Sequence, residues 1–283
     1  MLTKAFFADV LDELIADDPG NRAEVPGQGS IQLFDAPLIG VADAHDPLFN
    51  RFRDPDIIGD AFLAPCEWIP EAQSVISFFF PFTEALRRSN RGSSAWPSLA
   101  WAYGRYEGQT FIVACLEALK QRLAEEGVNA VIPTRDPRFT VRIVPVAALA
   151  EDGESPDSPE TTEGGDFRAN SAWSERHVAY ACGLGTFGLS RGFITERGMA
   201  GRLGSIIVDC ALPPDARPCD DPMAYCIRCG ACVRNCPAHA ISLEHGKSNR
   251  LCNAYLDTTR EHFAPRYGCG KCQVDVPCES RRP

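Results

Sequence analysis

The chain has 283 residues, 45% of them hydrophobic and 23% charged, which is ordinary for a soluble globular protein and favours one large domain with a small one. A net charge of −10 and an isoelectric point near 5.0 disfavour nucleic-acid binding through a broad basic face. No apolar run approaches the length of a membrane span, and Asp9, Asp12 and Glu13 argue against a signal peptide. We therefore expect a cytoplasmic protein with no membrane partner.

Hydrophobic periodicity predicts a mixture of helices and strands before residue 150. The first helix ends at Asp18-Pro19-Gly20, and Gly127 is placed to cap the second. Long loops of basic, aromatic or acidic residues separate these elements, and loops of such length often carry function. The predicted helices lie at 4–16 and 109–126, the strands at 38–42, 75–82, 128–132 and 141–146, and the irregular segments at 21–30, 49–65, 87–101 and 151–165.

A helix is predicted over residues 173–182, with Ser171 as its cap and Glu175 near its positive end. Glycine-rich turns follow at 183–188 and 198–204. The first is not a dinucleotide fingerprint, because it follows a helix rather than a strand. A strand at 205–209 and a proline-rich linker come next, so we place a domain boundary near residue 211. This gives an α/β domain over 1–210 and a small domain over 211–283.

The strongest signal is the run Cys226-Ile-Arg-Cys229-Gly-Ala-Cys232-Val-Arg-Asn-Cys236-Pro237. The spacing CxxCxxCxxxCP is typical of four-iron clusters, and its fourth cysteine usually binds a second cluster. A zinc site would need only two close cysteine pairs. The ferredoxin rule of exchanged fourth ligands assigns a first cysteine set of Cys226, Cys229, Cys232 and Cys278, and a second cysteine set of Cys236, Cys252, Cys269 and Cys272.

Two clusters in one small domain would lie close enough to pass electrons. The alternative is that they only stabilise the fold, although one cluster would suffice for that. The chain has 13 cysteines, and most of the remaining five are interpreted as small buried residues: Cys66, Cys115, Cys182, Cys210 and Cys219. Clusters require a reducing compartment, so disulfides are not expected.

Two stretches resemble the epoxyqueuosine reductases and, more distantly, the reductive dehalogenases. They are Trp173-Ser-Glu-Arg-His-Val-Ala-Tyr-Ala-Cys-Gly-Leu-Gly-Thr-Phe-Gly188, leading into Gly201-Arg-Leu-Gly204, and Tyr267-Gly-Cys-Gly-Lys-Cys-Gln in the tail. The resemblance implies a nitroreductase-like α/β domain followed by a ferredoxin-like domain with two [4Fe-4S] clusters. It also implies a cobalamin between the domains, reduced by the nearer cluster. The positions matching the family's corrinoid-lining backbone are Gly183, Gly185, Gly204 and Ser205.

The sequence departs from this family in three places. The family's acidic proton donor is missing, because the matching stretch reads Arg168-Ala-Asn170-Ser-Ala-Trp173. Val276-Pro277 stands where the family has Cys-Pro, so the ligand moves to Cys278. The family's helical-repeat domain does not follow the clusters. With the acidic charge, these departures predict that tRNA is not the substrate.

A reduction needs a proton source near the cofactor. Tyr103, Arg105 and Tyr106 are candidates, because a phenol beside a guanidinium has a lowered pKa; alternatively, both tyrosines pack in the core. Glu175 is a further candidate, or else an acid that stabilises its helix start. His177 is a candidate too, or else a surface or packing residue, and Asp166 could replace the missing acid.

The sequence thus predicts an iron–sulfur oxidoreductase that passes electrons through two clusters to a cofactor and a small organic substrate at the domain interface. A low-potential donor such as ferredoxin or flavodoxin would supply the electrons. Two alternatives stay open: a non-enzymatic electron carrier for a partner protein, and a structural iron–sulfur module of a larger complex. The large N-terminal domain favours the enzyme, because a carrier needs little beyond residues 215–283.

Overall fold

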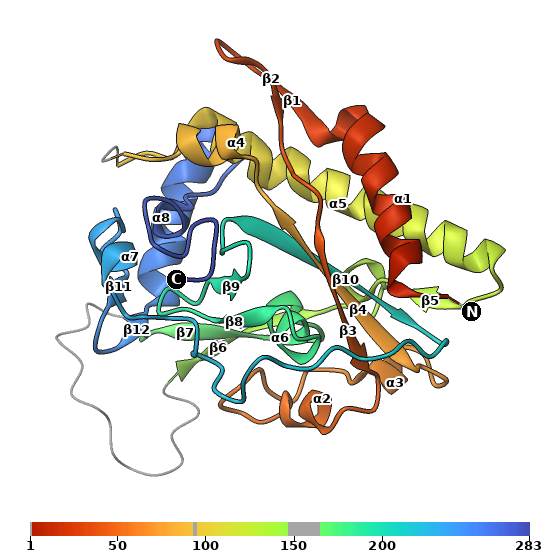
Figure 1. Cartoon of the computed structure of the whole chain (residues 1–283). Coiled ribbons are helices and arrows are strands. Elements are labelled where there is room, and N and C mark those ends of the chain that lie inside the picture. Colours follow the sequence, from red (N-terminus) through yellow and green to blue (C-terminus); the bar gives the residue numbers. More distant parts are fainter. Residues whose placement is uncertain (1, 93–94, 147–164) are drawn as a thin grey trace, which may run out of the picture.

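A computed structural model describes residues 2–92, 95–146 and 165–283, and shows a mixed α/β fold (Figure 1). The predicted loop at 151–165 lies almost entirely outside the described residues. The helices are α1 (Lys4–Asp17), α2 (Pro47–Arg51), α3 (Pro65–Trp68), α4 (Glu84–Ser89), α5 (Leu99–Glu125), α6 (Glu175–Ala181), α7 (Ala231–Arg234) and α8 (Asn249–Phe263), with short 3-10 turns at η1 (Pro19–Asn21), η2 (Pro133–Arg135) and η4 (Lys271–Gln273).

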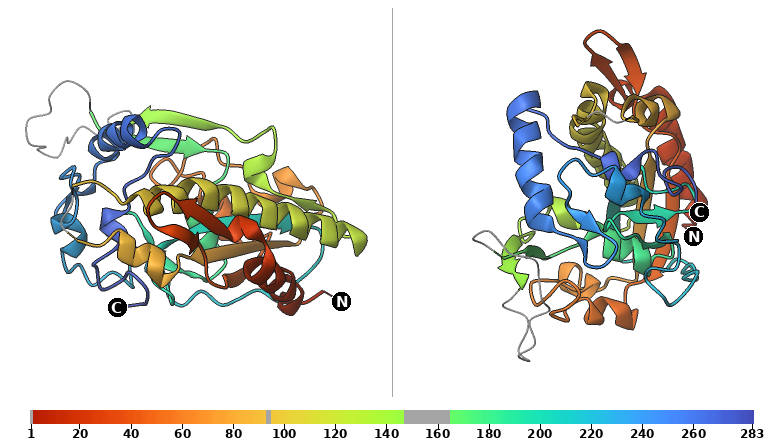
Figure 2. Two further views of the ribbon diagram at one scale, coloured as in Figure 1. Left: turned by 90° about the horizontal axis from the view of Figure 1, so that it is seen from above. Right: turned by 90° about the vertical axis from the view of Figure 1, so that its left-hand side faces the viewer.

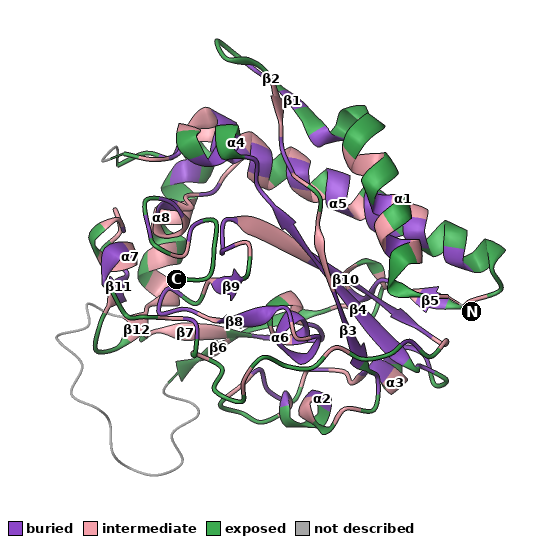
Figure 3. Cartoon of the chain, in the orientation of Figure 1, coloured by how far each residue is buried: buried purple, intermediate pink, exposed green. Residues whose placement is uncertain are grey.

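An antiparallel four-stranded sheet in the order β3-β4-β10-β5 forms the centre of the fold. Its strands are β3 (Leu38–Asp43), β4 (Ser74–Pro81), β5 (Ala130–Val131) and β10 (Gly201–Val208). All of β4 is buried, as its unbroken apolar run predicts, because it pairs on both edges and is covered on both faces (Figure 3). The remaining strands form two-stranded ribbons: β1 (Arg22–Val25) with β2 (Gly29–Gln32), β6 (Val141–Pro145) with β7 (Phe167–Ser171), β8 (Gly185–Phe187) with β9 (Phe193–Thr195), and β11 (Ile241–Ser242) with β12 (Gly246–Lys247).

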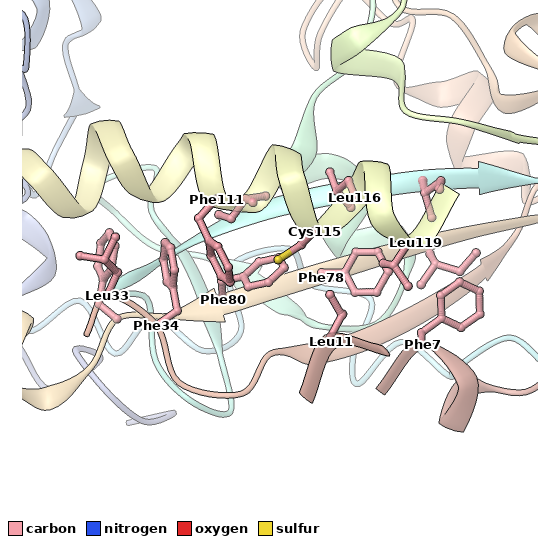
Figure 4. Close-up of a cluster of buried hydrophobic side chains, with 14 of the residues drawn as sticks. Phe7, Leu11, Leu33, Phe34, Phe78, Phe80, Phe111, Cys115, Leu116 and Leu119 are labelled. Carbon is pink, nitrogen blue, oxygen red and sulfur yellow. The ribbon is translucent and has the colours of Figure 1, made fainter. Parts of the chain in front are cut away.

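Helices cover the two faces of this sheet. On one face, α1 and α5 pack over a core of aromatic and aliphatic side chains, including Phe7, Phe78, Phe80 and Phe111 (Figure 4). On the other face, α6 contacts β3, β4 and β10, and Trp173 lies nearly parallel to the ring of Phe62 at a centroid distance of 5.5 Å. The C-terminal segment with α7 and α8 gathers at one end of the sheet (Figures 1 and 2).

The predicted loop at 87–101 is shorter in the structure, where residues 90–92 and 95–98 are irregular, and the predicted helix start at 109 is wrong. Residues 84–89 form α4, and α5 already begins at Leu99, because the Ser98 hydroxyl accepts a hydrogen bond from the Trp101 amide at 3.1 Å. Gly104 and Gly108 make the helical pattern weaker at this point of the sequence, since glycine destabilises a helix. A Cβ at Gly104 would lie 2.4 Å from Leu86, so close helix packing explains that glycine.

Smaller differences concern element ends. The segment 21–30 contains most of the β1–β2 hairpin, and the irregular segment 49–65 contains most of α2 and the start of α3. Ser171 does not cap α6; its hydroxyl donates to the Trp173 carbonyl at 2.9 Å. No helix among the described residues is both long and apolar enough to cross a membrane.

Candidate functional site: two cysteine cavities beside a large cavity

The first cysteine set surrounds a small cavity of about 20 Å³, here called the first cysteine cavity. Cys226 and Cys229 come from a tight loop in which Arg228 and Gly230 have positive φ angles of 50° and 71°, and Cys232 lies on α7, which follows it. Cys278 reaches it from the C-terminal segment. The amide of Met199 donates to the Cys278 carbonyl at 2.9 Å and holds that segment in place. Apolar side chains fill the remaining wall: Leu189, Ile194, Met199, Tyr225 and Val276.

The second cysteine set surrounds a separate cavity of about 230 Å³, here called the second cysteine cavity. Cys236 follows α7, Cys252 lies on α8, and Cys269 and Cys272 flank the turn into η4. Gly270 in this turn has φ of 65°, and a Cβ there would lie 2.1 Å from the Trp101 ring. The aromatic ring on α5 therefore fixes the turn that presents both tail cysteines.

The two cysteine sets are neighbours. One apolar group is formed by Leu189, Cys236, Ala240 and Ile241. Cys226 and Cys232 of the first set pack against it, and so do Cys252 and Cys272 of the second set. Burial raises the pKa of Cys232 to about 11 and the pKa values of Cys269 and Cys278 to about 12. These thiols would thus be protonated at neutral pH unless a metal displaces the proton.

Among the described residues, no group of three or more His, Cys, Asp or Glu side chains is arranged to hold a single metal ion. A four-iron cluster does not require such convergence, because each cysteine binds a different iron. The donor type, four thiols around each cavity, suits iron–sulfur clusters.

A third, large cavity of about 850 Å³ adjoins the second cysteine cavity. Arg176, Lys247, Cys252 and Leu256 line both. Phe52, Phe187 and Met223 contribute apolar wall, and β7 and α6 contribute polar side chains. Its volume lies in the upper part of the range for ligand pockets, so it can admit a substantial organic ligand.

Glu175 lies at the start of α6 in the wall of the large cavity. Its Oε2 atom is buried and has no hydrogen-bond partner among the described residues. Burial raises the pKa of Glu175 to about 7, while a hydrogen bond with Ser205 opposes this rise. Glu175 can therefore hold a proton near neutral pH, which suits a general acid.

His177 follows two residues later and lines the same cavity. Burial, assisted by the charge of Arg176, lowers the pKa of His177 to about 4, so its ring is neutral at pH 7. One ring nitrogen lies 2.8 Å from the Ser174 hydroxyl. His177 thus serves as a neutral hydrogen-bonding wall residue.

Positive charge gathers in the large cavity although the chain is acidic overall. Its cationic side chains outnumber its acidic ones: Arg51, Arg168, Arg176, Arg191 and Lys247 against Asp56, Glu175 and Asp220. Burial lowers the pKa of Arg168, and so does the charge of Arg191, while Asp56 opposes them. Neither Arg168 nor Arg191 forms an ion pair within the described part of the chain.

Tyr103, Arg105 and Tyr106 lie on α5 and not in a loop. Arg105 lines the second cysteine cavity, but neither tyrosine lines it or the large cavity. The Arg266 guanidinium lies 3.6 Å from the Tyr103 ring centroid, and Tyr106 is 43% exposed. The phenol that faces Arg105 is instead Tyr267, whose pKa is lowered mainly by the charge of Arg105.

The predicted corrinoid-lining glycines face the protein's own atoms. A Cβ at Gly183 would lie 2.8 Å from the Ala216 carbonyl oxygen, and one at Gly185 would lie 1.9 Å from the Ile194 carbonyl oxygen. Gly204 faces Ile112 and Leu116 of α5, at 3.1 Å from each. Ser205 lies on the other face of β10, where its hydroxyl accepts a hydrogen bond from the Trp173 indole at 2.8 Å.

Asn170 and Asp166, which lie near the place of the missing acid, form hydrogen bonds with other residues of the protein. Asn170, at the position of the missing acid, donates to Asp60 at 2.7 Å and accepts from the Ala61 amide at 3.1 Å. The Asp166 carboxylate accepts from the Arg250 amide at 2.9 Å, at the start of α8. Of the candidates, only Glu175 presents an unpartnered carboxylate oxygen in the cavity wall.

A family described as "4Fe-4S binding domain" matches residues 223–242, which contain Cys226, Cys229, Cys232 and Cys236. This match supports [4Fe-4S] cluster binding by the chain.

Several curated proteins are similar to part of the chain. The epoxyqueuosine reductase of Alicycliphilus denitrificans is 33% identical over 122 residues, covering 39% of this chain and 29% of that protein. That of Vibrio cholerae is 32% identical over 114 residues, covering 36% and 30%. The ferredoxin-type protein MauM of Methylorubrum extorquens is 40% identical over 72 residues, covering 25% and 30%. Each match spans less than a third of the relative's length. These matches confirm the predicted resemblance to epoxyqueuosine reductases.

Solved structures that are similar to the chain share little sequence identity with it. Epoxyqueuosine reductase from Bacillus subtilis is 19% identical, with a TM-score of 0.47, over 88% of this chain and 62% of that chain. The reductive dehalogenase NpRdhA is 13% identical, with a TM-score of 0.48, over 98% and 37%.

A further similar solved structure is an epoxyqueuosine reductase with an epoxyqueuosine-modified tRNA-Tyr stem loop (18% identity, TM-score 0.45). The prediction that tRNA is not the substrate used the net charge of −10, which does not describe the cationic large cavity.

Proposed function

We propose that the protein is an iron–sulfur oxidoreductase that passes electrons through two [4Fe-4S] clusters to an organic substrate in the large cavity. The observation that carries this proposal is the arrangement of the three cavities. One cysteine set of four lines each of two cavities, and Cys252 of the second set also lines the large one. The similarity to epoxyqueuosine reductases supports a reduction as the reaction class.

The order of the cavities suggests the direction of electron flow. Cys229 of the first set is exposed, so a low-potential donor such as a ferredoxin or flavodoxin can approach the first cluster. The second cysteine set is the nearer one to the large cavity, because Cys252 lines that cavity whereas no cysteine of the first set does. Electrons would therefore enter at the first cysteine set and leave through the second.

Glu175 is the proton source in this proposal. Its carboxyl group lies in the cavity wall with one oxygen unpartnered, and its pKa of about 7 keeps a proton available at neutral pH. It would take over the role of the acid that the sequence lacks near Asn170. Tyr103 and Tyr106 are not needed, since neither lines the cavity.

The residues of the large cavity fit a bound cobalamin. The volume admits a large group, Phe52 and Phe187 supply apolar wall, and Gly188 lines the cavity in place of the glycines first expected. When bound, cobalamin would supply a low-valent cobalt centre of strong nucleophilicity. Arg176 would hold it from an α/β domain that we propose is nitroreductase-like and spans residues 1–210, and Lys247 would hold it from the small domain over 211–283.

The excess of cations in the large cavity favours an anionic ligand. Arg168 and Arg191 form no ion pair among the described residues, although the charge of Asp56 acts on Arg168, and guanidinium groups bind phosphate and carboxylate well. A phosphate-bearing substrate, including a nucleic-acid segment, is compatible with this lining. The second candidate function, an electron carrier, is favoured by the exposed Cys229, but it leaves the large cavity and Glu175 without a role.

Anaerobic spectroscopy tests the proposal. Protein purified without oxygen should show the absorption of [4Fe-4S] clusters, and reduced protein should change the spectrum of added cobalamin. Clusters without any response to cobalamin would remove the corrinoid and leave the two-cluster reductase. Zinc in place of iron would contradict the proposed function.

A further inference from the structure

Three arginines surround the second cysteine cavity: Arg105, Arg176 and Arg202. Arg105 projects from α5, Arg176 from α6 and Arg202 from β10, so three separate elements bring their charges to one place. Arg176 interacts electrostatically with Cys272 and Cys252 of the second set. Lys247 also lines this cavity and interacts with Cys272.

Within the described residues, no carboxylate forms an ion pair with any of the three arginines. Arg202 donates to the neutral Gln109 amide oxygen at 3.0 Å, and Arg176 donates to the Arg191 carbonyl at 2.9 Å. The Nε atom of Arg105 is buried without a hydrogen-bond partner, and its guanidinium lies over the Tyr267 ring. The described part of the chain contains no ion pair that involves these three side chains.

The first cysteine cavity has a different surrounding. Its lining is almost entirely apolar apart from the cysteines, with Ile194, Met199 and Val276 against the thiols. The cation among its lining residues is Arg228, whose guanidinium already donates to the Leu243 carbonyl. This difference matters because a cluster with four thiolates is anionic and reduction adds a further negative charge.

We propose that Arg105, Arg176 and Arg202 raise the reduction potential of the cluster at the second cysteine set above that of the first. Their charges stabilise the reduced cluster, whereas the apolar wall of the first cavity disfavours added negative charge. One electron then moves from the first cluster, which is oxidised, to the second, which is reduced. The arrangement makes this transfer downhill and delivers reducing equivalents beside the large cavity.

This inference rests on the proposed two-cluster function and is tested by redox titration monitored by electron paramagnetic resonance. Signals are assigned with Cys252→Ser and Cys278→Ser, which alter the second and first clusters respectively. In the wild type, we expect the second cluster to have the higher potential. In Arg202→Gln, the ratio of reduced to oxidised second cluster at a fixed potential should fall about tenfold. For one electron, this corresponds to a decrease of about 59 mV in the reduction potential of that cluster. The potential of the first cluster should not move.

Three further variants separate charge from structure. Arg202→Lys keeps the charge and should restore most of the potential, while Arg105→Gln should lower it as Arg202→Gln does. Arg228→Gln, the matched control at the first cysteine cavity, should leave the second cluster unchanged. Iron content equal to that of the wild type shows that each variant is assembled.

Two results would overturn the inference, and they differ in meaning. In the first, the iron-replete variants Arg202→Gln and Arg105→Gln both keep two clusters, and the reduction potential of the second cluster is unchanged. This would refute the role of the arginines while the proposed function stands. Absence of any four-iron signal in the wild type would refute the proposed function and the inference together.

Discussion

The two cysteine cavities use the same four-thiol donor set in opposite surroundings. The first is formed by one compact loop and the C-terminal segment, and its wall is apolar. The second draws its cysteines from three separate segments, lies against α5, and is lined by arginines. The second shares Arg176, Lys247, Cys252 and Leu256 with the lining of the large cavity, whereas the first shares Gly188. The difference indicates that ligand type determines which cofactor binds, whereas the neighbouring side chains determine what that cofactor does.

The largest effect is expected from Glu175→Gln. If chemistry occurs on the side of the second cysteine cavity, removing the proton source should lower turnover by about 10²–10⁴-fold, while both cluster spectra stay intact. Glu261→Gln, at an exposed position on α8, is the control and should leave turnover unchanged. Full turnover in Glu175→Gln would place the proton source elsewhere.

The pH dependence gives the next largest effect. The pKa of Glu175 is raised from 4.5 to about 7, so the acid is present below that pH and ionises above it. Turnover should therefore fall about tenfold per unit as pH rises above 7. The stability contribution has the same sign: it is fully present below about 4.5 and is lost as pH rises through about 7. Glu175→Gln should flatten both profiles; profiles that keep the wild-type slope would contradict the assignment.

Arg168→Gln tests the cationic side of the large cavity. Removing one guanidinium that contacts an anionic ligand should raise KM about tenfold, corresponding to one charge-assisted hydrogen bond. Arg142→Gln is a matched control, because Arg142 is exposed on β6, the strand that pairs with β7. An unchanged KM, with phosphate esters giving no inhibition, would show that the ligand is not anionic.

Two glycine substitutions, one beside each cysteine cavity, should each remove one cluster and so halve the iron content. A Cβ at Gly198 would lie 2.3 Å from the Glu279 carbonyl oxygen, so Gly198→Ala should displace Cys278 and lose the first cluster. A Cβ at Gly270 would overlap the Trp101 ring, so Gly270→Ala should lose the second. Each variant should keep about half of its iron. Loss of all iron from either one would mean that the two cavities do not assemble independently.

Spacing in the sequence was sufficient to group the eight cysteines into the two sets that line the two cavities, because each set follows a local motif or a known rule of ligand exchange. Buried strands such as β4 were also predictable from their apolar runs. The surroundings were not predictable, since Arg105, Arg176 and Arg202 are far apart in sequence and meet only through the sheet.

Glycines are ambiguous in the sequence for a related reason. Gly104 interrupted the helical pattern, although it only allows Leu86 to approach α5, and Gly204 faces α5 where a cofactor was expected. A glycine shows that some atom comes close, but the sequence does not say whether that atom belongs to the protein or to a ligand. Tyr267 was likewise missed, because the arginine that lowers its pKa lies on a distant helix.

The most direct test of the two-cluster account is the iron and sulfide content of anaerobically purified protein, measured together with Cys278→Ser, Cys226→Ser and their double variant. The account predicts about eight irons in the wild type, about four in each single variant and no further loss in the double variant, because both cysteines belong to the first set. Cys219→Ser, whose cysteine packs beside the first set, should keep all eight. About four irons in the wild type, or an intact first cluster in Cys278→Ser, would contradict it.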